Sequence, residues 1–173
     1  ETEAAHVGDT LTRMAISRPD VAFNWISEGR EQLRAQRGNL LRRLARTLGK
    51  NTADNLHEIS FSGNGIAIHG FLSAPKTCRS ATSAMFTYIN GRFVRDRVIQ
   101  HAIMQAYRGV IDRGRYPVVA LFMELSPGEV DVNVHPTKHE VRFRRQALVH
   151  DTLLSALEEL LRKSPWLIHK ESQ

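Results

Sequence analysis

The residue best placed for chemistry is Lys138, in the segment Val130–Phe143, which reads VDVNVHPTKHEVRF. Valine alternates with polar residues in its first half, which predicts a strand with one apolar face. Pro136 offers no backbone N–H to a sheet, so the strand should end there and leave Thr137 and Lys138 on a short loop. A lysine held on such a loop is suited to contact an anion from outside the domain.

A second segment, Tyr88–Arg97, reads YINGRFVRDR and concentrates positive charge. Guanidinium groups bind phosphate bidentately, so its arginines are candidates for contacts with the DNA backbone. The alternative is an ordinary solvated surface. The three candidates precede or open an expected helix: Arg92, Arg95 and Arg97.

Polar neighbours of Lys138 could support its loop. Asn133 and His135 could hydrogen-bond to the backbone and orient it, and Thr137 lies on the loop itself. His135 also raises the question of a metal site. The further ligands available to such a site would be His139, Glu140 and His150. Their spacing fits no known ligand set and no cysteine joins them, so no metal is expected.

Both segments closely resemble the MutL family of DNA mismatch-repair ATPases, which has a V-D-V-N-V-H-P-x-K-x-E-V-R-F run and an upstream Y-V-N-x-R segment. The resemblance implies that Lys138 contacts the γ-phosphate of ATP bound in the adjacent ATPase domain of the same chain. It also implies that Arg97 contributes to DNA binding in the groove between the arms of a dimer, with Arg95 beside it. A mismatch-recognition protein of the MutS type is a further expected partner. The parent protein is expected to be a homodimer and this fragment a monomer.

The fold expected from pattern alone is α+β, a mixed sheet with helices packed on it. The resemblance implies a ribosomal-protein-like transducer domain with a left-handed βαβ crossover, although right-handed crossovers dominate elsewhere. One domain is expected over residues 1–163, with a C-terminal tail or the start of a linker over 164–173. The chain begins without methionine, which suggests a fragment of a longer protein.

Motifs that the family uses for ATP hydrolysis do not occur in this sequence: the E-x-x-x-N helix, D-x-G-x-G and the Gly-rich lid. The D-Q-H-A-x-x-E-R endonuclease motif is also missing, which leaves open whether the parent protein is a nuclease. We therefore expect no ATP hydrolysis by this fragment alone and no cofactor in it, with ATP and Mg²⁺ bound in the parent's adjacent domain.

Several elements can be predicted from periodicity. A short helix is expected over 10–17, and Asn39 should cap a helix whose leucine stripe ends at Gly49. Gly63-Asn64-Gly65 lies between two strands and reads as a hairpin turn rather than a phosphate loop. The strand at 130–135 is expected to pair back on the apolar strand at 117–125. Three arginines of the Asn39-capped helix are expected on a solvated face, with DNA contact as the alternative: Arg42, Arg43 and Arg46.

Composition bounds the partners. The 173 residues carry a net charge of +6 and a pI near 10.0, which favours nucleic acid or an acidic protein surface. A single cysteine, Cys78, excludes an internal disulfide and fits a reducing cytoplasm. No membrane span is expected. Two other functions stay open, namely the transducer of a related ATPase such as a type II topoisomerase or chaperone, and a free-standing RNA-binding domain of ribosomal type.

Overall fold

The computed structural model describes residues 2–164, and the chain divides into two compact units, Glu1–Leu56 and His57–Gln173. The sequence predicted one domain over residues 1–163. Residues 165–173, most of the predicted tail, lie outside the described part, so the tail stays a prediction. No helix among the described residues is long and apolar enough to cross a membrane.

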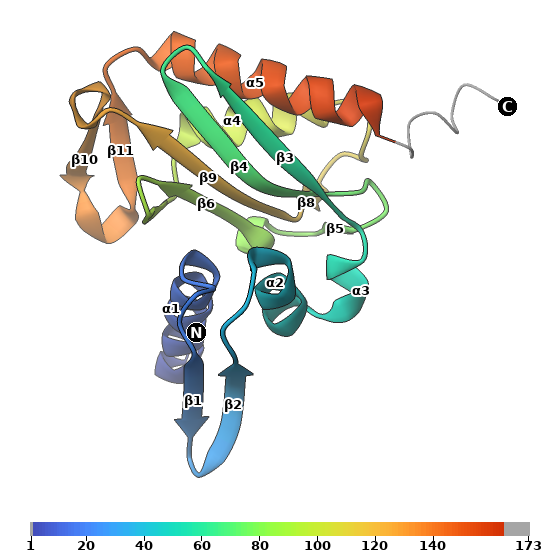
Figure 1. Cartoon of the computed structure of the whole chain (residues 1–173), viewed down its shortest axis with the longest axis vertical. Helices are drawn as coiled ribbons and strands as arrows, with labels where there is room; N and C mark the ends of the chain where they lie inside the picture. Colours follow the sequence, from blue (N-terminus) through green and yellow to red (C-terminus); the bar gives the residue numbers. More distant parts are fainter. Residues whose placement is uncertain (1, 165–173) are drawn as a thin grey trace, which may run out of the picture. The chain divides into compact units, whose positions relative to one another are not determined.

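The first unit pairs a β-hairpin with helices, as Figure 1 shows. Its elements are α1 (Glu3–Ser17), β1 (Phe23–Ser27), β2 (Arg30–Ala35), α2 (Leu40–Leu48) and α3 (Lys50–Ala53). Helix α1 starts well before the predicted position because the Thr2 hydroxyl accepts a hydrogen bond from the Ala5 N–H and caps it. The predicted cap of α2 is confirmed, since the Asn39 side chain accepts from the Arg42 N–H at 2.9 Å.

The prediction of a solvated face on α2 is wrong for Arg43, whose side chain is only 2% exposed. Its guanidinium donates to five backbone carbonyls of the first unit, and it lies 5.4 Å from the centre of the Phe23 ring. Burial lowers the pKa of Arg43, while nearby Asp20 acts in the opposite direction. Helical periodicity could not reveal this, because the carbonyls come from α1, from the loop after it and from the connection after β2, which only the tertiary fold brings to α2.

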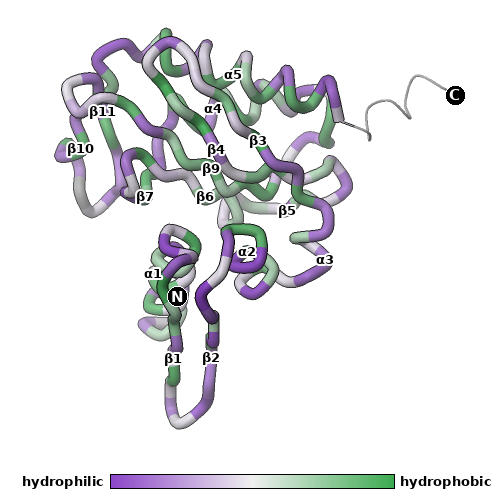
Figure 2. Tube along the Cα trace, viewed as in Figure 1, coloured by the Kyte–Doolittle hydropathy of each residue, from purple (hydrophilic) through white to green (hydrophobic). Residues whose placement is uncertain are grey.

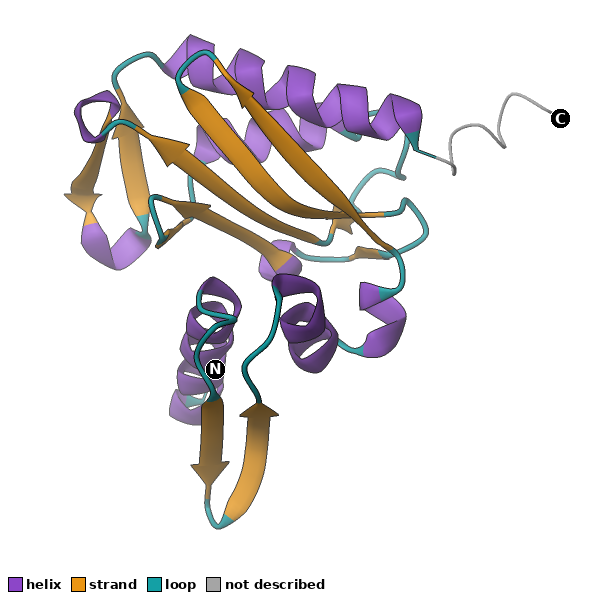
Figure 3. Ribbon diagram, in the orientation of Figure 1, coloured by secondary structure: helices purple, strands orange, loops and turns teal. Residues whose placement is uncertain are grey.

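The second unit is built on a five-stranded mixed sheet in the order β3-β4-β9-β6-β7 (Figure 3). Strands β4 and β9 pair antiparallel, β6 and β9 parallel, and β6 and β7 antiparallel. The sheet strands are β3 (Leu56–Gly63), β4 (Ile66–Ser73), β6 (Met85–Ile89), β7 (Arg92–Val94) and β9 (Val119–Leu125). The apolar strand predicted at 117–125 corresponds to β9, which has a hydrogen-bonded strand on each side. The predicted hairpin turn between β3 and β4 is confirmed, with positive φ at Asn64 and Gly65.

Two helices, α4 (Arg97–Ala106) and α5 (Gln146–Lys163), lie side by side on one face of this sheet. The apolar stripes of both helices and the inward side chains of the sheet form one core. Figure 2 shows the hydrophobic residues along the central strands. The α+β class is confirmed. The left hand of the crossover from β6 through α4 to β9 stays a prediction.

The Lys138 segment does not pair as predicted. Strand β10 (Val130–His135) pairs antiparallel with β11 (Glu140–Phe143) in a separate two-stranded sheet, not with β9. A one-turn 3-10 helix, η2 (Pro127–Glu129), separates β9 from β10. The chain does turn at Ser126–Gly128, but a turn does not determine which strand the next strand pairs with. The lysine turn therefore lies at the end of a two-stranded arm formed by β10 and β11.

The remaining short elements line the loops of the second unit. These elements are β5 (Cys78–Arg79), η1 (Thr82–Ala84), β8 (Tyr116–Pro117) and η3 (Pro136–Lys138). Cys78 lies on the short strand β5, where the Arg115 side chain donates to its carbonyl at 2.9 Å.

Candidate functional site

Lys138 lies at the end of η3, the single turn that connects β10 and β11, and its side chain is exposed. The strand ends at His135, as Pro136 predicted. The next residue, His139, has a positive φ of 58°, a left-handed conformation that reverses the chain into β11. Backbone geometry therefore presents the lysine at the tip of a short arm.

The predicted supporting residues are placed around this turn. Asn133 is exposed on β10, and its backbone N–H donates to the Asp131 carboxylate at 3.0 Å. The His135 ring lies 3.9 Å from the Glu140 carboxylate, across the base of the turn, and Thr137 is exposed on η3. These positions bring the residues together, while their orienting role stays a prediction.

His139 joins the lysine turn to the arginine segment. The Arg95 N–H donates to the His139 carbonyl at 2.9 Å. The His139 ring packs edge-on against Phe93, with 5.2 Å between ring centres, and the Arg95 guanidinium lies 5.7 Å from the centre of the Phe93 ring. The two segments that the sequence singled out are thus in direct contact. The sequence did not predict that His139 and Phe93 link the two segments, because neither residue spacing nor residue type indicates a contact between segments so far apart in the chain.

The contact is anchored in the central sheet. Phe93 begins a row of rings that crosses four strands, with 5.7 Å between the ring centres of Phe93 and Tyr88, 4.6 Å between Tyr88 and Phe122, and 5.0 Å between Phe122 and His69. Adjacent members of the row are register partners in the ladder. Such cross-strand aromatic pairs stabilise a sheet, so the surface beneath His139 is firmly held.

The three candidate arginines are exposed on a fixed frame. Arg92 lies on β7, Arg95 follows that strand, and Arg97 is the first residue of α4. The Asp96 carboxylate caps α4 and accepts from the N–H groups of Val98 at 2.8 Å and Ile99 at 3.1 Å. Burial raises the pKa of Asp96, against the lowering effect of these two hydrogen bonds. The cap therefore fixes the backbone between two exposed guanidinium groups.

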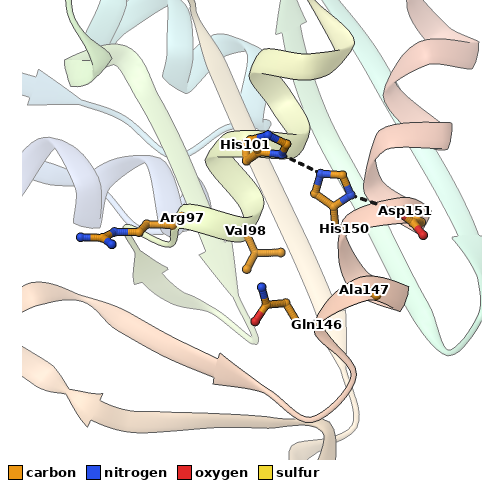
Figure 4. A pocket seen from close by; sticks show the side chains of 7 residues that line it. All are labelled: Arg97, Val98, His101, Gln146, Ala147, His150 and Asp151. Carbon is orange, nitrogen blue, oxygen red and sulfur yellow. Dashed lines mark hydrogen bonds and ion pairs between the residues drawn. The ribbon is translucent and has the colours of Figure 1, made fainter.

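Arg97 also borders a hollow of about 620 Å³ between the N-terminal ends of α4 and α5 (Figure 4). His101 and His150 meet there with 2.9 Å between ring nitrogens, and the second nitrogen of His150 lies 3.0 Å from the Asp151 carboxylate. In Figure 4 the Arg97 side chain extends away from the histidine pair. The sequence could not show this pair, because only helix packing brings the two rings together. Over residues 2–164 no three His, Cys, Asp or Glu residues are arranged to hold a metal ion.

The mixed sheet, the two helices on one of its faces and the two-stranded lysine arm define the second unit as an α+β domain whose fold recurs in solved proteins. The N-terminal domain of a DNA repair protein superposes with a TM-score of 0.74 at 18% identity, over 95% of this chain and 53% of that one. The Aquifex aeolicus MutL ATPase domain complexed with ADP superposes with a TM-score of 0.55 at 22% identity, over 72% and 43%. The gyrase B-subunit of Myxococcus xanthus gives 0.55 at 16% identity, over 95% and 52%. At these identities the likeness shows the fold.

The family follows from sequence. The family model described as DNA mismatch repair protein, C-terminal domain, matches residues 44–162. The DNA mismatch repair protein MutL of Pelobacter propionicus is 76% identical over 167 residues, and that of Geobacter sulfurreducens is 56% identical over 172 residues. These matches cover 96% and 99% of this chain and 28% of each relative. The chain belongs to the MutL family of DNA mismatch repair proteins, and it spans about a quarter of the length of the relatives that it matches.

Proposed function

We propose that this chain is the part of a MutL mismatch-repair ATPase that senses ATP in the adjacent ATPase domain and relays its state to DNA. The observation that supports this most directly is the His139 link, because it joins the exposed lysine turn to the exposed arginine segment. A relay needs contacts that respond to nucleotide at one end and to a partner at the other. Family membership favours this function over the topoisomerase and ribosomal alternatives.

In this proposal Lys138 contacts the γ-phosphate of ATP. ATP and Mg²⁺ belong to the adjacent domain and supply the chemistry of phosphoryl transfer there. A lysine ammonium is a compact positive charge, well suited to neutralise charge on the phosphoryl oxygens. Thr137, Asn133 and His135 hold the turn that presents it. The exposed position of Lys138 at the end of a two-stranded arm fits a group that acts outside its own domain.

The test is steady-state ATP hydrolysis by the protein extended to include the upstream domain, with Lys138→Ala compared with Lys76→Ala, another exposed lysine of the second unit. Loss of one pre-aligned donor should lower kcat by about 10²–10³-fold. The control should be unaffected. Nucleotide affinity and thermal unfolding of each variant check that the fold is intact, and an unchanged kcat for Lys138→Ala would remove this lysine from the mechanism.

The second part of the proposal is that Arg92, Arg95 and Arg97 contact the DNA backbone. In a binding titration at several salt concentrations, Arg95→Gln with Arg97→Gln should reduce the slope of log K against log salt by about 0.9 for each phosphate that the variant no longer neutralises. An unchanged slope would contradict it. We further propose that the parent protein is a cytoplasmic homodimer that meets a mismatch-recognition protein of the MutS type.

A further inference from the structure

Arginines of the first unit surround a recess of about 290 Å³ that none of the proposed contacts uses. The recess is close to the lower limit of ordinary ligand pockets, about 300 Å³, which suits a compact group rather than a large apolar one. Its lining comes from β2, from α2 and from the connection between them. All of the lining residues except Gln36 are arginines. They are Arg34, Gln36, Arg37, Arg42, Arg43 and Arg46.

The positive charge of the recess is poorly compensated from within. The Glu31 carboxylate lies 3.9 Å from the Arg34 guanidinium, and Asp20 acts electrostatically on Arg43 without forming an ion pair with it. In the described part of the chain Arg37 and Arg42 have no carboxylate within ion-pair distance. Both are exposed, so their five-donor guanidinium groups are available to a ligand.

The arrangement is held in place by the backbone. Arg43 is buried beneath the recess and is fixed by its carbonyl partners, including that of Gln36 at 3.0 Å. The Arg46 side chain donates to the backbone carbonyl of Arg34 across to β2. Arg42 and Arg46 are four residues apart on α2, a spacing at which like charges destabilise a helix. Two of the lining arginines, Arg43 and Arg46, are therefore fixed, and positive charges held close together are typical of a site that is neutralised by an anion.

We infer that this recess binds backbone phosphates of DNA, as a site separate from the Arg92–Arg97 segment. It rests on the proposed function only for the choice of DNA as the partner. Guanidinium forks match phosphate oxygens bidentately. A protein partner is less suited, because the lining offers no aromatic or aliphatic residue as an anchor, whereas interfaces with DNA are strongly positive and polar.

The test uses the full 173-residue chain and a short labelled DNA duplex, followed by fluorescence anisotropy at several salt concentrations. The variant Arg37→Gln with Arg42→Gln should weaken binding about tenfold and lower the salt slope by about 1–2. The control Arg30→Gln with Lys50→Gln also removes two positive charges from the first unit, but at positions outside the recess. It should leave the slope within about 0.3 of the original, by the same counterion reasoning. Thermal unfolding should be the same for both.

The outcomes separate the two surfaces. A reduced salt slope in the recess variant supports the inference whatever the effect of Arg95→Gln with Arg97→Gln. If that second variant has no effect, only the proposed DNA contact of the Arg92–Arg97 segment is overturned. An unchanged slope in the recess variant overturns the inference even if the segment variant loses affinity. A parallel titration with a polyglutamate peptide tests the other partner. Binding of that peptide, abolished in the recess variant while DNA binding is kept, would assign the recess to an acidic protein and also overturn the inference.

Discussion

Replacing Arg43 by methionine should destabilise the first unit severely, although the residue lies on a helix face where arginines are usually solvated. The guanidinium donates to the carbonyls of Ala15 and Arg18 through one nitrogen and to three others through the second. The other acceptors are the carbonyls of Pro19, Val21 and Gln36. One side chain therefore ties α1, the loop after it and the end of β2 to α2.

The magnitude follows from opposing effects. Hydrogen bonds to a charged group contribute about 1.5–3 kcal/mol each, so the five together are worth on the order of 10 kcal/mol before costs. Burying the charge costs several kcal/mol, and the Nε atom of Arg43 is buried without a hydrogen-bond partner. Some of the abandoned carbonyls can take up water in the variant. The net loss for Arg43→Met should therefore be about 3–4 kcal/mol, near the upper range of single substitutions.

The assay is urea unfolding followed by circular dichroism, together with hydrogen exchange to locate the loss. Arg42→Met is the matched control, since Arg42 is the exposed neighbour on the same helix and should change stability by less than about 0.5 kcal/mol. Arg43→Lys separates charge from geometry, because an ammonium cannot reach five carbonyls as the planar fork does, and it should lose about 2 kcal/mol. Increased exchange should concentrate in the first unit, where all five acceptors lie.

A loss below about 1 kcal/mol in Arg43→Met would refute this reasoning, because it would mean that the five hydrogen bonds and the desolvation of the charge nearly cancel. Full stability of Arg43→Lys would refute the narrower point that the fork geometry is needed.

Three further substitutions test the frame of the second unit. Gly70→Ala should cost about 3–5 kcal/mol in urea unfolding, since a Cβ there would lie 1.9 Å from the Ala120 carbonyl oxygen and φ is +138°. Asn90→Ala should cost about 2–3 kcal/mol in the same assay, because the Asn90 side chain satisfies both the N–H and the carbonyl of Leu125, each at 3.0 Å. Burial raises the pKa of Asp96 above 3.8, so its contribution to stability is complete below that pH and falls as the pH rises through the folded-state pKa. Asp96→Asn keeps a cap without this loss, so its stability relative to the original should rise between about pH 3.5 and 7, and a difference independent of pH would contradict this.

Local signals in the sequence predicted elements well. The Asn39 cap, the Asn64-Gly65 turn and the strand stop before Pro136 all follow from the chemistry of one or two residues, and the structure has each of them. The α+β class followed from the same periodicities. The errors at Arg43 and at the pairing of β10 arose where packing or strand pairing decided the outcome, because periodicity says which face of an element is apolar and not what will meet it. Arg43 looked like any charged helix residue until the loops that cover it were in place.

The same limit applies to the candidate site. Residue type and the resemblance singled out Lys138 and Arg95, but only the fold shows that the backbone N–H of Arg95 is bonded to the carbonyl next to Lys138. The pairing of β10 with β11 rather than β9 matters here, since it frees the lysine turn from the central sheet and leaves His139 as its connection to β7. This connection gives the proposed relay a physical form.

The relay can be tested at that connection. Phe93→Leu removes the ring on which His139 packs while keeping an apolar residue, so it should weaken the hold on the turn more than it disturbs the sheet. If ATP and DNA affect one another through this contact, the variant, made in the protein extended to include the upstream domain, should bind each ligand alone nearly as before. It should lose part of the effect of one ligand on the affinity for the other. Coupling between two ligands is reciprocal. The loss must therefore appear both in the affinity for DNA measured with and without ATP and in the affinity for ATP measured with and without DNA. A variant in which binding of either ligand changes but the coupling stays intact would show that the contact holds the structure together without carrying the signal.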